Sequence, residues 1–296
     1  MLSLLLALTL AGSPPGPVSG PAPVVVPPAD AAADTVLAVR RGDRLASSSL
    51  AGSVEIRGWD RDEVLVESAP PGEGGVSASR RGGEVVLGGR DTKGRRLERS
   101  VRLRVPRWME VELEGRRLSV DAAGLSSAVS VRTVDGDVRV RDVEGAVAVR
   151  SVAGTVQVED VRGTVSAGTL EEAVVVRRVT GSVRVESTDG DLFLEEVDGE
   201  RVEAVTVDGD VTFLGVLRAG GTYRFSTHDG DVLVTVPRDA GAEVSVSTFD
   251  GSFQADFPVT VERFQGGRET SFRLGSGGAR LVIQAFDGDI HLRQRR

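Results

Sequence analysis

The feature that most constrains this chain is a turn residue that recurs every nine positions between Ser127 and Gly199. Glycine stands at most of these positions, namely Gly136, Gly145, Gly154, Gly163, Gly181, Gly190 and Gly199, while Ser127 and Glu172 occupy the other two. A fixed period is typical of repeat architectures, in which each unit buries its apolar side chains against its neighbours. The repeat therefore predicts a scaffold and says little about chemistry.

Apolar residues hold regular places within each unit. Counted from the turn residue, positions +2 and +4 are apolar, as in Val156 and Val158 after Gly154. This alternation, mostly of β-branched residues, predicts short strands with one buried face. The residues at +7 are apolar as well: Val143, Val152, Val161, Leu170, Val179 and Val197. They break the parity of the strand, so we expect the chain to turn a corner near +5 or +6 in every unit.

A second period sets the number of strands in one coil. Hydroxyl and charged residues alternate at +6: Thr133, Asp142, Ser151, Asp160, Thr169, Arg178, Ser187 and Glu196. Like residues thus recur every 18 positions, and the hydroxyl row continues at wider spacing through Thr206, Thr227 and Thr248. The +5 residues Arg141, Glu159, Arg177 and Glu195 also lie 18 apart and alternate in sign, which predicts a charge ladder on stacked strands.

These two periods predict an all-β fold, a parallel β-solenoid with two strands per coil of 18–21 residues. Parallel strands joined by repeated crossovers are nearly always right-handed, so a right-handed winding is expected. Low aromatic content, 4%, suits a thin core between two sheets. Six phenylalanines gather in the last 48 residues and suggest a cap on the open end of the stack: Phe249, Phe253, Phe257, Phe264, Phe272 and Phe286.

The domain boundaries follow from composition. Residues 1–13 are short, apolar and end in small residues, which predicts a signal peptide. Residues 14–34 are rich in Pro and Ala and predict an extended linker. Residues 35–296 form one solenoid domain, with irregular coils over 35–126, regular repeats over 127–205, and wider coils and a cap over 206–296.

The leader predicts an exported protein, periplasmic or secreted. Its apolar run is too short to cross a bilayer, so no transmembrane span is expected. The chain has no cysteine, and therefore no disulfide and no lipid-anchored cysteine.

Two further motifs repeat at a distance. The strand Val101-Arg-Leu-Arg-Val-Pro-Arg is echoed by Val232-Leu-Val-Thr-Val-Pro-Arg, and proline ends a strand by removing a backbone donor. Pro106 and Pro237 therefore mark matching corners. Asp-Gly-Asp turns recur in segments such as Thr206-Val-Asp-Gly-Asp-Val, and the chain closes with Ala285-Phe-Asp-Gly-Asp-Ile-His-Leu.

These segments, over roughly residues 50–296, resemble the bacterial β-strand-repeat family of putative adhesins. That family is a domain of unknown function related to the head domains of putative auto-transporter adhesins. The resemblance implies a bacterial, exported or envelope-associated protein without enzymatic activity. It carries no catalytic residue over to this chain.

The residues themselves offer little for catalysis. His228 and His291 are the only histidines, Lys93 is the only lysine, and cysteine is absent. A serine triad would have to use one of these histidines, both of which fit ordinary surface positions, and a phosphate loop or a histidine-rich zinc site is unavailable. We expect no catalytic residues and no cofactor.

Paired carboxylates at the turns are the one constellation with possible metal chemistry. The calcium candidates are Asp189, Asp191, Asp208, Asp210, Asp229 and Asp231. Calcium takes oxygen ligands and could bridge neighbouring coils. The favoured interpretation is structural, because Asp-Gly supplies a positive φ and a local side-chain hydrogen bond.

Two surfaces are candidates for binding a partner. Ten basic residues against three acidic ones lie between Arg80 and Arg107, among them Arg95, Arg96 and Arg99, in a chain of net charge −8. This region could meet an anionic envelope surface, although solvated strand faces explain it as well. A nucleic-acid partner is not expected, because no aromatic residues are interleaved with the charges. The second surface is an outward apolar strip, which either forms a docking site or is covered by a loop: Val175, Phe193, Leu214 and Leu233.

The sequence thus favours a non-catalytic exported or envelope scaffold that binds an unidentified surface polymer or envelope protein. The alternative is a carbohydrate-active β-helix enzyme, a hydrolase or lyase, that uses turn carboxylates. A groove lined by three or more carboxylates with a basic neighbour would favour the enzyme, and flat faces would favour the scaffold.

Overall fold

The computed structural model describes residues 35–68, 76–89, 98–265 and 269–295. They belong to one compact unit, Ala32–Arg296. The expected signal peptide and linker lie outside the described residues. Every element of the described chain is a strand, so the all-β prediction is confirmed. No helix in the described residues is long and apolar enough to cross a membrane.

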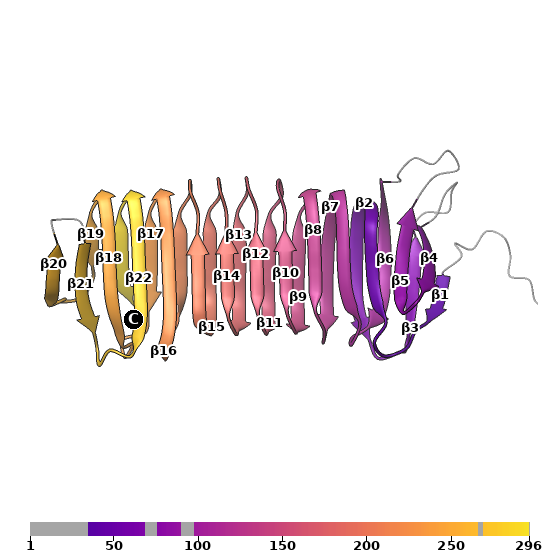
Figure 1. The fold of residues 1–296 in the computed structure, drawn as a ribbon, viewed down its shortest axis with the longest axis horizontal. Helices are drawn as coiled ribbons and strands as arrows, with labels where there is room; N and C mark the ends of the chain where they lie inside the picture. The colour runs from indigo at the N-terminus through magenta and orange to yellow at the C-terminus, as the bar shows by residue number, and fades with distance from the viewer. Residues whose placement is uncertain (1–34, 69–75, 90–97, 266–268, 296) are drawn as a thin grey trace, which may run out of the picture. The chain divides into compact units, whose positions relative to one another are not determined.

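The regular repeats form stacked parallel strands (Figure 1). These strands are β8 (Val129–Asp135), β9 (Val138–Glu144), β10 (Val147–Arg150), β11 (Val156–Arg162), β12 (Val165–Gly168), β13 (Val174–Thr180), β14 (Val183–Glu186) and β15 (Leu192–Val205). Face 1 contains β9, β11, β13 and the start of β15, and face 2 contains β8, β10, β12 and β14. Consecutive strands therefore alternate between the two faces.

The register links residues eighteen apart. Val156 pairs with Val138 on one side and with Val174 on the other, all in parallel strands. Farther along, Val183 pairs with Val202 and Val211 with Val232, so the spacing widens. The predicted pairing of residues eighteen rather than nine apart is confirmed. The charge ladder forms as well, with Glu159 between Arg141 and Arg177.

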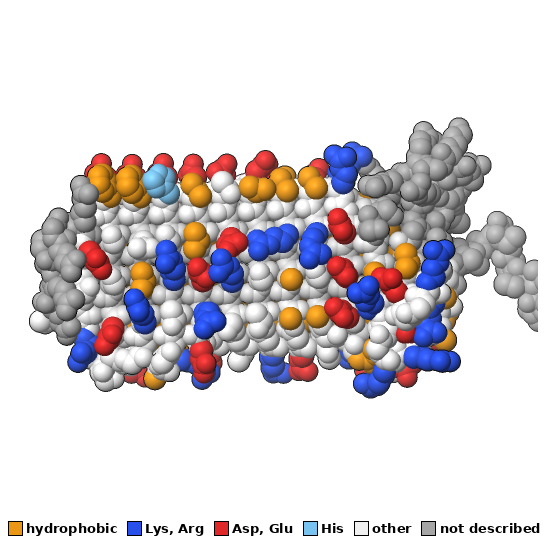
Figure 2. All heavy atoms as spheres, in the orientation of Figure 1, with side chains coloured by type: hydrophobic (Ala, Val, Ile, Leu, Met, Phe, Trp, Pro, Cys, Tyr) orange, Lys and Arg blue, Asp and Glu red, His pale blue; other side chains and the backbone are white. Residues whose placement is uncertain are grey.

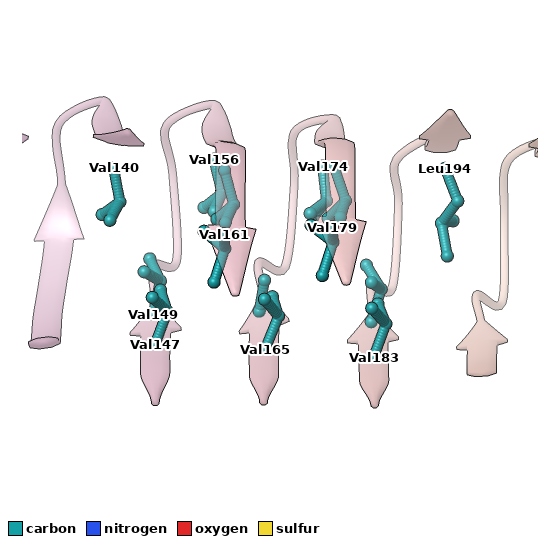
Figure 3. Packing of buried hydrophobic residues seen from close by; sticks show 14 of the residues in the cluster. Val140, Val147, Val149, Val156, Val161, Val165, Val174, Val179, Val183 and Leu194 are labelled. Atoms are coloured by element: carbon teal, nitrogen blue, oxygen red, sulfur yellow. The ribbon is translucent and has the colours of Figure 1, made fainter. Parts of the chain in front are cut away.

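The core lies between the two faces and consists mainly of valine. Val156 and Val158 have no exposed surface, whereas Gln157 between them faces outward and accepts hydrogen bonds from Arg139. Figure 3 shows the valines of face 1 meeting those of face 2 in stacked rows. β-Branched side chains fit this thin layer because facing sheets lie only ~10 Å apart.

The corner differs between alternate units, contrary to the expectation of one corner type. At Asp142, Asp160, Arg178 and Glu196 the backbone has a positive φ of 51–55°, which returns the +7 valine to the core. In the other units the +6 hydroxyl is buried and the +7 residue turns outward. Leu170 is 45% exposed there, and Val152 is only half-buried.

The N-terminal coils are not stacked in chain order. Their strands are β1 (Thr35–Ala38), β2 (Arg44–Trp59), β3 (Glu63–Ser68), β4 (Val76–Arg81), β5 (Glu84–Gly89), β6 (Glu98–Pro106) and β7 (Glu110–Leu125). β2 pairs with β7 on one side and with β5 and β6 on the other. The coil formed by β2 is therefore inserted between two later ones.

The C-terminal coils show the same kind of insertion. Their strands are β16 (Val211–Asp229), β17 (Val232–Val236), β18 (Ala242–Asp250), β19 (Phe253–Ala255), β20 (Val261–Gln265), β21 (Glu269–Leu274), β22 (Ala279–Asp287) and β23 (Ile290–Gln294). β22 lies between β16 and β18, and β23 lies between β17 and β19. The coil of β22 and β23 is thus internal to the stack.

The ends also correct the prediction of a wholly parallel solenoid. β3 runs antiparallel to β1 and β6, and β4 to β5. At the other end β21 runs antiparallel to β18 and β20. Antiparallel strands connected by short turns can close a stack without another crossover.

The phenylalanine cap is only partly as expected. Phe253, Phe257 and Phe272 pack on the core. Phe249 and Phe286, by contrast, are about half exposed, at 50% and 46%. The side chain of Phe264 lies outside the described residues.

Candidate functional site

The acidic turns stack along one edge of the molecule, where the chain passes from face 2 to face 1. Bridges join Asp189 to Asp208 and Asp208 to Asp229, and the strand register continues to Asp287 and Asp250. All five carboxylates are exposed. We call them, with Glu171 of the preceding coil, the acidic edge row (Figure 2, upper edge). Their spacing is that of neighbouring strands, ~4.8 Å.

The second aspartate of each pair has a different role. Asp210 accepts a hydrogen bond from the backbone N–H of Asp231 (2.8 Å), and Asp231 accepts one from Asp289 (2.7 Å). The same contact joins Asp137 to Thr155, Asp191 to Asp210 and Asp289 to Ser252. Each carboxylate after a turn glycine therefore binds an amide of the neighbouring coil. The hydrogen bonds from the Ser252 backbone and side chain lower the pKa of Asp289.

The calcium candidates divide between these two roles. Asp191, Asp210 and Asp231 each have an oxygen engaged with a backbone amide, and Asp189, Asp208 and Asp229 belong to the acidic edge row. In the described part of the chain, no group of three or more His, Asp or Glu side chains is placed to hold a metal ion.

A row of mostly apolar side chains runs beside the acidic edge row, one residue earlier in each turn. Backbone hydrogen bonds and strand register connect its members, which we call the apolar edge row: Val134, Val152, Leu170, Thr188, Val207, His228, Phe286 and Phe249. Eight large hydrophobic side chains are exposed among the described residues, and five of them belong to this row. Figure 2 shows the row directly below the carboxylates.

Three rings form a stack at one end of the apolar edge row. Phe249 and Phe286 are nearly parallel, with centroids 4.8 Å apart and an interplanar angle of 3°. His228 stacks on the other side of Phe286 at 4.6 Å. Phe286, in the middle of the stack, therefore has a ring against each of its faces.

Two hollows lie beside the apolar edge row, on the side away from the carboxylates. One, of about 560 Å³, is lined by Leu170 and Thr188 together with Arg150, Arg184 and Arg224. The other, of about 380 Å³, is lined by the three stacked rings and by threonine and serine side chains. The edge is therefore a narrow apolar strip between a row of charge and a line of hollows.

The apolar strip predicted on face 1 is not continuous. Val175 and Phe193 are in register, and Phe193 is 38% exposed. The next partner of Phe193 is Thr212, which in turn pairs with Leu233. Leu214 pairs with Glu195 and so lies in a different column.

The basic segment from Arg80 to Arg107 is largely engaged where its side chains are described. Arg80 donates to Asp43 at 2.8 and 2.9 Å, and this contact lowers the pKa of Asp43. Arg102, Arg104 and Arg107 form ion pairs with Glu55, Glu67 and Asp60, respectively. Arg95 and Arg96, and the side chain of Arg99, lie outside the described residues.

One hollow has the lining that would favour an enzyme, three carboxylates with a basic neighbour. It measures about 420 Å³ and is lined by Asp142, Glu144 and Asp160 with Arg162 and Arg178. Two ion pairs lie within it, with Arg162 bound to Glu144 at 3.0 Å and Arg178 to Asp160 at 2.7 Å. The hydrogen bond from Arg178 lowers the pKa of Asp160. A general acid in glycoside hydrolysis needs a carboxyl with a raised pKa, so this one is unsuited to that role.

Comparisons with known proteins give one family and one structure. Residues 177–293 match the family model described as Toastrack DUF4097, a domain of unknown function; this range is narrower than the resemblance expected over residues 50–296. A crystal structure described as that of a putative cell adhesion protein from Clostridium sporogenes ATCC 15579 is 10% identical, with a TM-score of 0.27. That alignment covers 89% of this chain and 99% of the other. No curated protein matches.

Proposed function

We propose that this protein is a non-catalytic, exported scaffold, periplasmic or secreted, that binds a surface polymer or an envelope protein along its turn edge. The observation that carries the proposal is the concentration of exposed hydrophobic side chains in the apolar edge row. Exposed apolar residues scattered singly are normal, whereas a contiguous patch marks an interaction site. The Toastrack match over residues 177–293 covers most of this edge.

The geometry of the carboxylates supports binding over catalysis. The acidic edge row lies on exposed turn tips, and in the hollow near Asp160 arginine side chains bind Asp160 and Glu144. Every carboxyl of the described chain with a shifted pKa has it lowered: Asp43, Asp121, Asp160, Glu186 and Asp289. Lowered values suit ion pairs and caps rather than proton donors.

We further propose a right-handed solenoid with two strands per coil and an N-terminal signal that is removed on export. The hand follows from the general preference of parallel crossovers. Fractionation of expressing cells, with mass determination of the mature N-terminus, would test export. A protein retained in the cytoplasm with residues 1–13 intact would contradict it.

The test of the scaffold is a binding experiment with an activity control. The purified full chain is immobilised and exposed to envelope fractions and to a panel of surface glycans, and the same glycans are assayed for release of reducing or unsaturated ends. We expect retention of a ligand without cleavage. Glycan cleavage that is lost in Asp160→Asn would establish the enzyme alternative instead.

A further inference from the structure

The dimensions of the apolar edge row exclude a broad partner surface. Its eight positions span seven strand steps, about 34 Å at ~4.8 Å each. With the width of one or two side chains, about 10 Å, the row offers roughly 340 Å². A stable protein–protein interface needs about 800 Å² per partner, so a second copy of this chain is a poor fit. A narrow row fits a single extended chain that crosses the strands.

The charge beside the row defines the chemistry of that chain. Asp189, Asp208, Asp229, Asp287 and Asp250 lie on five adjacent strands without interruption and face solvent. Stacked carboxylates of this kind repel one another, and cations from a ligand would relieve the repulsion. The ligand should therefore carry positive charge along one side.

The stack of Phe249, Phe286 and His228 bears on whether a polysaccharide or a peptide fits this edge. A sugar ring packs on the face of an aromatic side chain, but both faces of Phe286 are covered by Phe249 and His228. Ring edges and the methyl groups of Leu170 and Val207 instead form a surface for aliphatic side chains. The hollow lined by Phe249 and Phe286 provides lateral room for such a side chain. These features favour a peptide over a polysaccharide.

We propose that the apolar and acidic edge rows together bind an extended basic peptide segment, a proposal that rests on the scaffold function above. The peptide lies across the strands, with apolar side chains on the apolar edge row and lysine or arginine on the carboxylates. A polyproline II helix advances about 9.3 Å in three residues, close to two strand steps of about 9.6 Å. A three-residue repeat of one basic and one apolar residue therefore stays in phase with the edge.

The probe is a fluorescein-labelled (Lys-Pro-Leu)₄ peptide, whose length of about 37 Å matches the row. Binding to the full chain is measured by anisotropy at low and moderate salt. The matched peptides are (Glu-Pro-Leu)₄, which reverses the charge, and (Lys-Pro-Ser)₄, which removes the apolar contacts. We expect the first peptide to bind, with an affinity that falls as salt rises. Both matched peptides should bind at least about fivefold more weakly.

Two double variants locate the binding. Asp208→Asn with Asp229→Asn removes two charges from the middle of the acidic edge row, and Leu170→Ser with Val207→Ser breaks the apolar one. Each should weaken (Lys-Pro-Leu)₄ binding by roughly fivefold. Matched controls change equally exposed residues elsewhere, namely Asp239→Asn and Val216→Ser, and should leave affinity unchanged. Unchanged affinity in either double variant would overturn the proposal.

A measurement on the unmodified chain removes dependence on variant folding. Benzoylphenylalanine replaces one leucine of the peptide, and the crosslinked residues are identified by mass spectrometry. Crosslinks to the apolar edge row are expected, and crosslinks confined to other surfaces would contradict the proposal. If the peptide does not bind while an envelope ligand is still retained, the basic-peptide assignment fails and the scaffold stands. Glycan cleavage would instead remove the scaffold itself.

Discussion

The buried hydroxyl side chains at equivalent positions of successive coils differ in their hydrogen bonds. They form a column of Thr133, Ser151, Thr169, Ser187, Thr206 and Thr227. Thr206 Oγ1 donates to the Gly190 carbonyl at 3.1 Å, and Thr227 Oγ1 to the Gly209 carbonyl at 2.9 Å. Ser187 occupies the same column but its Oγ is buried without a hydrogen-bond partner. Equivalent positions in the repeat therefore differ in energy, because only some of their hydroxyls are satisfied.

This difference predicts that removal of the hydroxyl costs stability at Thr206 but not at Ser187. Ser187→Ala deletes no hydrogen bond and should change the free energy of unfolding by less than about 0.5 kcal/mol. Thr206→Val keeps the shape but leaves the Gly190 carbonyl without this donor, and should cost about 1 kcal/mol. Chemical denaturation of both variants measures the two values. An equal or larger loss in Ser187→Ala would contradict the assignment.

The turn carboxylates predict acid sensitivity. Hydrogen bonds from the Ser252 backbone and side chain lower the pKa of Asp289 in the folded state. In the unfolded chain the carboxyl titrates near its ordinary value of about 3.9, so the unfolded state binds more protons below that pH. The contribution of this contact is thus present above about pH 4 and lost as the pH falls through the folded pKa.

Melting temperatures between pH 6 and pH 3 test this. We expect stability to fall at the acid end of the range and the fall to be shallower in Asp289→Asn, whose amide oxygen can accept the same bond without titrating. Asp239→Asn, at an exposed position away from the edge, serves as the control. A pH profile for Asp289→Asn identical to that of the unmodified chain would refute the linkage.

At the scale of the element, the corner within each of the face 1 strands β9, β11, β13 and β15 has a strained backbone. Asp142, Asp160, Arg178 and Glu196 all have left-handed backbone, which costs a non-glycine residue roughly 1 kcal/mol. Two of these four residues form an ion pair with each other, Arg178 with Asp160, and Arg178 also pairs with Glu159. The strain brings the following valine back into the core, where Val161 and Val179 are fully buried.

Glu196 offers a test of that strain. Asparagine tolerates the left-handed region, so Glu196→Asn should stabilise the protein by up to about 1 kcal/mol. A β-branched residue does not, and Glu196→Val should destabilise it by about 1–2 kcal/mol. Thermal melts give the order of the three proteins. A valine variant as stable as the asparagine variant would show that the corner relaxes to another conformation.

The strands and their register could be predicted from the sequence pattern. The corner at which the +6 hydroxyl is buried and the +7 residue turns outward could not. The buried faces follow from Val156 and Val158, and the coil from hydroxyls eighteen positions apart. The +7 residues look alike in both kinds of unit, however, and only those that follow Asp142, Asp160, Arg178 and Glu196 are buried. The distinguishing signal was the small hydroxyl before Val152 and Leu170, which fits inside where Asp142 or Arg178 cannot. The apolar edge row was missed because Leu170 and Val152 were counted with the core pattern.

At the scale of the whole molecule, the two coil insertions could not be inferred from local patterns. Strand pattern determines which face of a strand is buried but not which other coil it meets. The Val-Pro-Arg corners at Pro106 and Pro237 do lie at both insertions, since β6 pairs with β2 and β17 with β23. The repeated motif can be seen in the sequence. That it marks a coil insertion can be recognised only from the contacts between strands that are distant in the chain.

The inserted coil makes a strong prediction for truncation. Deleting residues 279–294 removes β22 and β23. β22 connects β18 to β16 through its hydrogen bonds, and β23 connects β19 to β17. We expect residues 242–274 to lose protection in hydrogen exchange, while β8 to β15 remain protected because their partners are intact. Full protection of β18 in the truncated protein would mean that it pairs directly with β16.

The internal position of β22 and β23 also determines the order in which the coils can assemble during synthesis. Coils up to β17 can add one after another as they leave the ribosome. β18 can pair with β21 once that strand has emerged, but β18 and β19 join the rest of the stack only when the segment ending at Gln294 arrives. A prematurely terminated polypeptide would present the open edges of β16 and β17 to chaperones and proteases. Only a chain synthesised through β23 therefore covers these edges and avoids recognition by chaperones and proteases.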